Sequence, residues 1–229
     1  MKRNRDAWEE NIYRKGRHLN RLPYTHVLQF LHQSFESFDL SRRRVLEVGC
    51  GAGNNLFAIR WLFNAEVYGI DFSEEAVRVA KNRFQEKGYE GFVLSIADAC
   101  SLPFRNEFFD AVIDRSALQH NLRDDIRRAV LEIFRVLRNN GVFYSMVTTT
   151  GDPAFGRGRK IGERTFFDDS EGVGTRYFFS EDDVSSLFQP FEITEWLFTE
   201  EFNVLSRQKR GSYYHLIMKK KGRPTKLRK

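Results

Sequence analysis

The sequence predicts an α/β protein built on a doubly wound, mostly parallel sheet. Between residues 42 and 150, short apolar segments typical of buried strands alternate with segments of helical periodicity. A glycine-rich stretch, VLEVGCGAGNN, joins the first of these strands to the first helix. Two strand-like segments near the C-terminus then predict an antiparallel closing pair.

The first elements follow an N-terminal helical cap over residues 1–40, where apolar side chains recur at helical spacing. The first strand is RRVLEVG (43–49), and a helix follows over 54–63. The second strand is EVYGID (66–71). The next helix begins after Ser73, whose hydroxyl can cap it.

The remaining parallel strands are GFVLSIA (91–97), FFDAVID (108–114) and VFYSMV (142–147). A helix opens at Asp124 and Asp125 between the last two of them. Its apolar stripe consists of Ile126, Val130, Ile133, Phe134 and Leu137. The glycine-containing NNG at 139–141 predicts a turn from this helix into the fifth strand.

The alternation ends after Thr150. The segment that follows is rich in Gly, Arg and Asp and has little periodicity, and a short helix is expected at 181–188. The closing strands are expected at 191–202 and 211–220. No linker divides the chain, so we expect one domain over 1–219 with four parts: a cap (1–40), a core (42–150), an insertion on the substrate side (151–179), and a closing helix and strands (180–219). A basic tail (220–229) follows the domain.

Composition indicates a packed globular chain. Its 229 residues are 41% hydrophobic, and the two cysteines have no metal-ligand spacing, so we expect no metal site. The charged N-terminus does not resemble a secretory signal and no long apolar run occurs, which predicts a cytoplasmic protein without a membrane span. The net charge of +6 comes from the last eleven residues, which hold seven Lys or Arg and no acid.

The glycine spacing predicts a ligand site. Gly49, Gly51 and Gly53 form GxGxG rather than the dinucleotide pattern GxGxxG, and Glu47 precedes them. An acid there disfavours a pyrophosphate and suits a cationic ligand. Asp71 ends the second strand, where a carboxylate can accept hydrogen bonds from both hydroxyls of a ribose. Asp98, after the third strand, could accept from an adenine amino group.

Four motifs in this order resemble the class I S-adenosylmethionine-dependent methyltransferases of the small-molecule, type 11-like group: VLEVGCGAG, YGIDFS, IADACSLPFRNEFFDAVIDRSALQH and VLRNNGVFYSMV. The resemblance implies a seven-stranded Rossmann-like sheet, S-adenosyl-L-methionine as cofactor and S-adenosyl-L-homocysteine as product. It also implies the following contacts: Gly49 and Gly51 along the methionine part with Glu47 beneath it, Cys50 in the same cofactor-binding loop, Asp71 at the ribose, Phe72 on the adenine, Asp98 and Ala99 at the adenine edge, and Arg115 beside the methionine part.

A role in packing alone remains open for several residues of these motifs. Cys50 suits a small filler in the loop rather than a nucleophile, and Gly53 can serve close packing of helix on strand. Phe72 could equally belong to an ordinary core.

His120 is the candidate general base, because a hydroxyl acceptor must lose a proton and His120 follows the fourth strand. A purely structural role for this side chain stays open. His18, His26 and His215 are weaker candidates. The sequence lacks the [DN]PP[YF] stretch of amino-group methyltransferases and a Pro-Cys nucleophile, which disfavours those chemistries.

The acceptor pocket is expected between segments 8–26 and 151–179, which are rich in aromatic and basic side chains. The candidate substrate contacts are Trp8, Tyr13, Arg21, Tyr24, Arg164 and Tyr177. Such a lining suits a small anionic acceptor, for example a phosphorylated sugar or a carboxylate. Two alternatives remain: a methyltransferase that binds RNA through the basic tail, and a non-catalytic member of the fold, which the intact cofactor motifs disfavour. The oligomeric state is left open.

Overall fold

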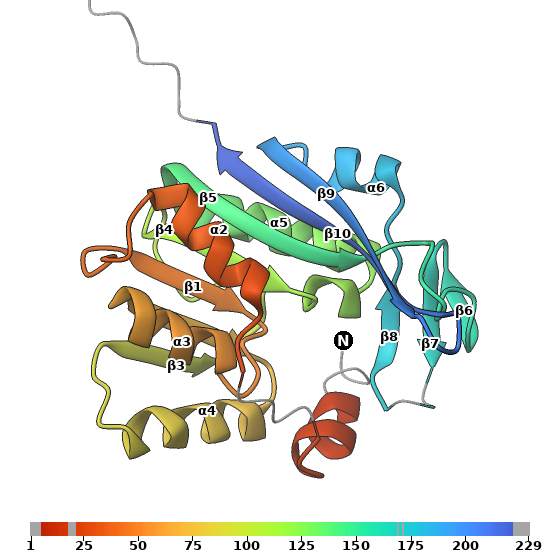
Figure 1. Cartoon of the computed structure of the whole chain (residues 1–229), viewed down its shortest axis with the longest axis horizontal. Helices are drawn as coiled ribbons and strands as arrows, with labels where there is room; N and C mark the ends of the chain where they lie inside the picture. Colours follow the sequence, from red (N-terminus) through yellow and green to blue (C-terminus); the bar gives the residue numbers. More distant parts are fainter. Residues whose placement is uncertain (1–5, 18–21, 169, 171, 222–229) are drawn as a thin grey trace, which may run out of the picture.

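The computed structural model describes residues 6–17, 22–168, 170 and 172–221 and contains one seven-stranded sheet between layers of helices (Figure 1). The strand order is β3-β2-β1-β4-β5-β10-β9, with β10 antiparallel to both of its neighbours. These strands are β1 (Arg44–Val48), β2 (Glu66–Asp71), β3 (Phe92–Ile96), β4 (Phe109–Arg115), β5 (Leu137–Thr148), β9 (Phe191–Asn203) and β10 (Gln208–Lys220). The predicted fold class is confirmed.

The order of the strands places the ligand crevice. The chain runs from β1 outward to β2 and β3, then returns to the other side of β1 with β4 and β5. This reversal is a topological switch point, and ligands in open α/β sheets bind beyond the carboxyl ends of the strands at such a point. The glycine loop follows β1 at that edge.

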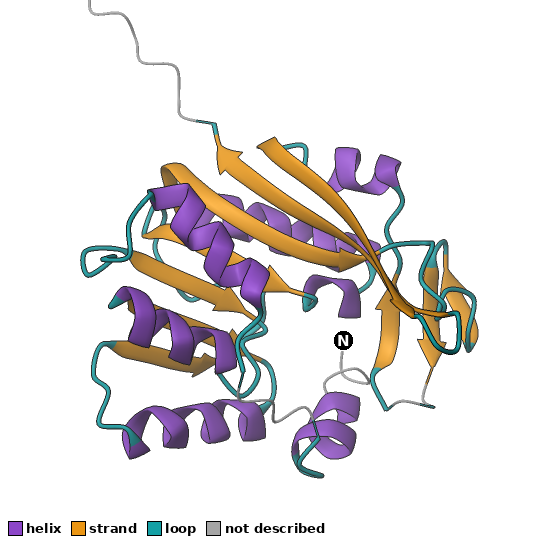
Figure 2. Cartoon of the chain, in the orientation of Figure 1, coloured by secondary structure: helices purple, strands orange, loops and turns teal. Residues whose placement is uncertain are grey.

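Helices cover both faces of the sheet (Figure 2). One face carries α2 (Thr25–Phe35), α3 (Asn54–Phe63) and α4 (Glu74–Glu86), and the other carries α5 (Arg123–Val136) and α6 (Glu181–Leu187). Successive strand residues enter opposite cores, because side chains alternate across a strand: Val45 packs with the first group and Leu46 with the second. Both cores are therefore built on the same strands.

The N-terminal segment closes part of this edge. The short π-helix η1 (Trp8–Tyr13) packs Ile12 and Tyr13 against Ala76 of α4 and Val173 of the insertion. Glu9 accepts a 2.5 Å hydrogen bond from the hydroxyl of Ser73, the residue that caps α4. The segment thus bridges α4 and the insertion.

The insertion holds a second, three-stranded antiparallel sheet that the sequence did not predict. Its strands are β6 (Arg159–Gly162), β7 (Thr165–Asp168) and β8 (Gly174–Tyr177). Each has four residues, which is too short for a clear alternation of apolar and polar side chains. The strand β8 of this sheet contacts the short 3₁₀-helix η2 (Leu118–His120).

One predicted turn is wrong. The turn at 139–141 lies inside a strand, because β5 begins at Leu137 directly after α5; Asn140, at φ +62°, accompanies a register shift against β4. The last strand, β10, ends at Lys220, where the closing strand is predicted to end, and Nζ of Lys220 donates a 2.6 Å hydrogen bond to the carbonyl of Leu137. Residues 222–229 lie outside the described part, and the division of the domain stays a prediction.

None of the helices in the described ranges is both long and apolar enough to cross a membrane.

Candidate functional site

The glycine loop needs glycine for two physical reasons. Gly49, Gly51 and Gly53 have φ values of +66°, +52° and +75°, which strain any residue with a Cβ. Space is also short: a Cβ on Gly49 would lie 2.3 Å from Cβ of Ala117, and one on Gly51 would lie 2.7 Å from the hydroxyl of Tyr13. The loop is therefore fitted closely to the segment after β4 and to the N-terminal helix.

Asp71, at the end of β2, holds this loop in place. One carboxylate oxygen accepts a hydrogen bond from the backbone N–H of Gly51 and the other from that of Ser73, both at 2.9 Å. Burial raises the pKa of Asp71 to about 6, and the two N–H donors oppose the rise. Each oxygen keeps a further acceptor position, so the buried group can still bind hydroxyls of a ligand.

Glu47 lies in β1 with its carboxylate buried beneath the loop. Its Oε1 accepts a 2.6 Å hydrogen bond from the side-chain amide of Asn55, while its Oε2 is buried without a hydrogen-bond partner in the described structure. Burial raises the pKa of Glu47 to about 8, and the amide and the charge of Arg115 oppose this rise. A positively charged donor bound at this partnerless oxygen would favour the ionised form of Glu47 and could donate to it.

Arg115 ends β4 and stacks on an aromatic ring. Its guanidinium carbon lies 3.4 Å from the ring centroid of Tyr24, and the backbone N–H of Tyr24 donates to Oδ1 of Asn55 at 2.9 Å. The positive charge of Arg115 lowers the pKa of the Glu47 carboxyl, which indicates that the two groups lie near each other. The two groups can face the two charged ends of an amino acid.

One cavity of about 1100 Å³ joins these groups at the carboxyl edge of the sheet. The predicted residues that line it are Trp8, Tyr13, Tyr24, Glu47, Gly49, Cys50, Gly51, Asp71, Phe72, Arg115 and His120. They come from the N-terminal segment and from the ends of β1, β2 and β4. The structure thus brings most of the predicted cofactor and substrate residues together.

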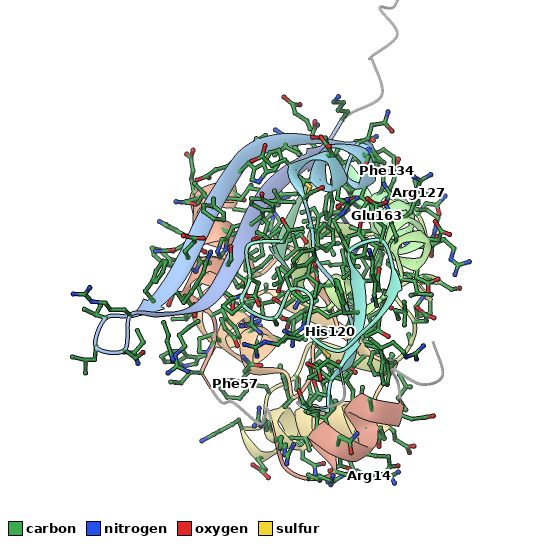
Figure 3. The ribbon with its side chains drawn as sticks, turned by 90° about the vertical axis from the view of Figure 1, so that its right-hand side faces the viewer. Arg14, Phe57, His120, Arg127, Phe134 and Glu163 are labelled. Atoms are coloured by element: carbon green, nitrogen blue, oxygen red, sulfur yellow. The ribbon has the colours of Figure 1, made fainter. Side chains whose placement is uncertain are left out.

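His120 belongs to η2 and faces the insertion (Figure 3). Its Nδ1 lies 3.1 Å from the backbone carbonyl oxygen of Thr175 in β8. A carbonyl can only accept a hydrogen bond, so Nδ1 carries the proton and Nε2 is the basic nitrogen. The ring also packs edge-on against Trp8, with centroids 4.9 Å apart. His120 therefore has the structural role that the sequence left open. Its basic nitrogen, Nε2, lies on the other side of the ring from Nδ1.

Asp98 and Ala99 follow β3 but do not line the cavity. Asp98 Oδ1 accepts a 2.8 Å hydrogen bond from the N–H of Cys100, and Ala99 packs against a core. Because Ile96 pairs with Asp71 across β2 and β3, both residues lie near the same edge of the sheet. Their predicted contact with an adenine stays a prediction.

Two predicted substrate residues lie elsewhere. Arg164 binds Asp183 of α6 through two nitrogens, at 2.6 and 3.0 Å. Tyr177 is fully buried, with its ring 4.9 Å from that of Phe179. Neither residue lines the cavity, and their predicted contact with a substrate stays a prediction. Arg21 lies outside the described residues.

The cavity also has a basic rim that sequence reasoning found only in part. The rim consists of Arg157, Arg176, Lys209 and Arg210. The first two belong to the insertion, where the sequence predicts acceptor contacts. Lys209 and Arg210 come from the start of β10, and only the hairpin brings them here. Lys209 forms an ion pair with Glu200. Asn55 was missed as well, although a polar side chain in the first turn after a glycine loop is a usable signal.

Among the described residues, no group of three or more His, Cys, Asp or Glu is arranged to hold a metal ion.

Comparisons with known proteins agree with this architecture. A family profile described as a methyltransferase domain matches residues 39–154, half of the chain. An uncharacterized methyltransferase of Bacillus subtilis, YcgJ, is 39% identical over 103 residues, 45% of this chain and 40% of that protein. The phthiotriol/phenolphthiotriol dimycocerosates methyltransferase of Mycobacterium tuberculosis is 33% identical over 117 residues, 51% of this chain and 42% of that protein. The chain thus covers about two fifths of these relatives' length.

Solved structures match over most of the chain and show the fold. A SAM-dependent methyltransferase of Methanosarcina mazei superposes with a TM-score of 0.70 at 21% identity, over 88% of this chain and 100% of that one. The 1,6-didemethyltoxoflavin-N1-methyltransferase of Burkholderia thailandensis, solved with its substrate and S-adenosylhomocysteine, gives 0.74 at 16% identity, over 96% and 88%. With the matching profile, the four ordered motifs and the seven-stranded sheet, the chain belongs to the methyltransferase-domain family, within the class I S-adenosylmethionine-dependent methyltransferases.

Proposed function

We propose that this chain transfers the methyl group of S-adenosylmethionine to a hydroxyl group of a small anionic molecule. One observation carries the proposal: the cavity has an acidic floor and a basic rim. Glu47 and Asp71 form the floor at the ends of β1 and β2, and the rim comes from the insertion and the β9–β10 hairpin.

The floor fits the cofactor. The partnerless Oε2 of Glu47 can accept from the ammonium group of the methionine part, and Arg115 can pair with its carboxylate. The carboxylate of Asp71 keeps acceptor positions for the two ribose hydroxyls. When bound, the cofactor supplies a methyl group on a positively charged sulfur, and the protein supplies position. The residues of the floor therefore bind and orient the methyl donor.

His120 supports a hydroxyl as the acceptor group. Its Nδ1–H is committed to the carbonyl of Thr175, which fixes Nε2 as the nitrogen that can take a proton. His120 lines the same cavity as the floor and the rim. A base held in one tautomer beside the methyl donor suits an acceptor that must lose a proton during transfer, and a carboxylate acceptor would need none.

The basic rim supports a negative charge on the acceptor. Arg157 and Arg210 are exposed at the cavity, beside Arg176 and Lys209. A carboxylate or phosphate on the acceptor would gain charge-assisted hydrogen bonds there and would be held away from the acidic floor. The toxoflavin enzyme, which has this fold, acts on a small molecule, which is consistent with a small acceptor here.

The test has two parts. Calorimetry with S-adenosylhomocysteine should detect binding that Asp71→Asn and Glu47→Gln each weaken. Assays with isotope-labelled cofactor should then compare hydroxylated carboxylates or phosphates with their neutral esters, and with total RNA. Faster labelling of the anionic compounds supports the proposal. Equal labelling of the neutral esters refutes the anionic acceptor, and labelling of RNA alone favours the tail-dependent alternative. A chain that does not bind S-adenosylhomocysteine refutes the whole proposal.

A further inference from the structure

The strand β9 forms one edge of the seven-stranded sheet. It pairs with β10 on one side, and no strand of the described part of the chain pairs with its other side. Figure 3 shows the hairpin of β9 and β10 curving along the outside of the molecule. A free edge presents a row of backbone N–H and C=O groups that another strand can bind. With thirteen residues, β9 is long for such an edge.

The middle of β9 is apolar and exposed on both of its faces. Trp196, Leu197 and Phe198 are consecutive, and their exposed fractions are 37%, 44% and 56%. Consecutive side chains of a strand point to opposite faces, so an aromatic pair lies on one face and a leucine on the other. The strand contains no proline and no lysine, which natural edge strands often use against pairing.

We propose that β9 pairs with β9 of a second copy of this chain, antiparallel, about a two-fold axis at Leu197. The strand spans Phe191–Asn203 and has a bulge at Thr194 in its pairing with β10, so an axis at its central residue leaves equal lengths of strand on both sides. Leu197 then faces Leu197 of the second copy, and Trp196 faces Phe198 twice. Cross-strand pairs of this kind stabilise antiparallel sheets.

The glutamates of β9 favour this register. With the axis at Leu197, Glu192, Glu195, Glu200 and Glu201 all lie opposite uncharged side chains of the second copy. Moving the axis by one residue changes this. An axis at Trp196 would set Glu192 opposite Glu200, and an axis at Phe198 would set Glu195 opposite Glu201. Like charges directly opposite each other destabilise a strand pair.

The same charges decide which partner the edge fits. The strand carries four acids and no basic side chain. An anionic lipid surface or a nucleic acid would be repelled along its length. A second copy meets uncharged residues at every acidic position and covers the exposed apolar centre.

Light scattering coupled to size exclusion tests the assembly. The full chain should be a dimer, and Leu197→Lys should make it a monomer, because two ammonium groups would then face each other at the axis. Leu205→Lys is the matched control: Leu205 is 98% exposed, lies in the hairpin turn outside β9 and should leave the dimer intact. Equal affinity for S-adenosylhomocysteine in both variants would verify that they are folded. A monomeric parent protein, or a dimer that survives Leu197→Lys, refutes the proposal.

Electron spin resonance tests the register. Spin labels at Glu192→Cys should lie ten residue steps apart across the axis, about 34 Å, and labels at Glu201→Cys eight steps apart, about 27 Å. An axis displaced by one residue would change both separations by about 7 Å in opposite directions. Cys50 is buried, and Cys100, which is partly exposed, is replaced by serine in every sample. Separations that fit another register or another surface refute the axis at Leu197.

Discussion

Asn55 joins Glu47 to the N-terminal segment. Its side-chain nitrogen donates to Oε1 of Glu47 at 2.6 Å, and its oxygen accepts from the backbone N–H of Tyr24 at 2.9 Å. Because Oε2 of Glu47 has no partner among the described side chains, the bond to Asn55 determines where that oxygen points. The segment before α2 and the floor of the cavity are thus connected through one amide.

Asn55→Ala should weaken binding of S-adenosylhomocysteine by about tenfold, the effect of losing one buried hydrogen bond. The affinity should be lost through weaker contacts with the methionine end of the ligand. Calorimetry should therefore show little change for 5′-methylthioadenosine, which lacks the amino acid group. Asn106→Ala is a suitable control, because Asn106 accepts a hydrogen bond from Arg135 at an exposed site outside the cavity. An equal loss for both ligands would contradict the assigned role.

Glu47 should make stability fall with rising pH. Burial raises its pKa to about 8 in the folded chain, against an ordinary value near 4.5. Between these values the folded state keeps a proton that the unfolded state releases, so the free energy of unfolding decreases as pH rises. Asp71 and Asp114, with pKa values raised to about 6, act in the same direction at lower pH.

Above about pH 7 the decrease should belong mainly to Glu47, at about 1 kcal/mol per pH unit until pH 8. Chemical denaturation of Glu47→Gln, which cannot titrate, should show a flatter profile over this interval. The same slope in both proteins would mean that Glu47 is already ionised in the folded chain.

The parts of the site that sequence predicts best are set by local structure. Glu47, the glycine loop and Asp71 lie at strand ends, and a parallel sheet brings all such ends to one edge. The strands themselves carry clear apolar patterns because both of their faces are buried. No long-range information is needed for either inference.

The remainder depends on contacts between distant segments. By composition alone, Arg157 and Arg164 are equally good candidates for acceptor contacts. In the structure Arg157 lines the cavity, whereas Arg164 is bound to Asp183 in α6. Lys209 and Arg210 reach the rim only because a long hairpin returns to the sheet. The strands β6 to β8 are stabilised by pairing with one another and leave little pattern in four residues each.

The basic rim should determine acceptor binding. Arg157→Gln and Arg210→Gln should each raise the KM for an anionic acceptor by about tenfold or more, since each removes a charge-assisted hydrogen bond. Affinity for S-adenosylhomocysteine, bound on the acidic floor, should not change. Lys160→Gln serves as a control, because Lys160 lies in the same insertion but does not line the cavity. An unchanged KM in both arginine variants would remove the rim from the acceptor site.

The tail beyond the last strand should be dispensable for this chemistry. A chain shortened after Lys221 keeps Lys220 and its bond to the carbonyl of Leu137. Its affinity for S-adenosylhomocysteine and its turnover of a small acceptor should match those of the full chain. If shortening instead abolishes methyl transfer, together with RNA binding of steep salt dependence, the RNA-modifying alternative replaces the small-molecule proposal.

His120→Asn separates the two roles that the geometry gives to this side chain. The amide of asparagine can replace Nδ1–H as donor to the carbonyl of Thr175, but it offers no nitrogen that can take a proton. Turnover of a hydroxyl acceptor should therefore fall by about 10²–10⁴-fold while the protein keeps its stability and its affinity for S-adenosylhomocysteine. His120→Ala, which removes both functions, should lose stability as well as turnover.

In the parent enzyme the rate should rise with pH as the imidazole loses its proton, and this dependence should be absent in His120→Asn. Turnover that survives in the asparagine variant would show that no base acts at this position, and the acceptor would then be a group that needs none, such as a carboxylate.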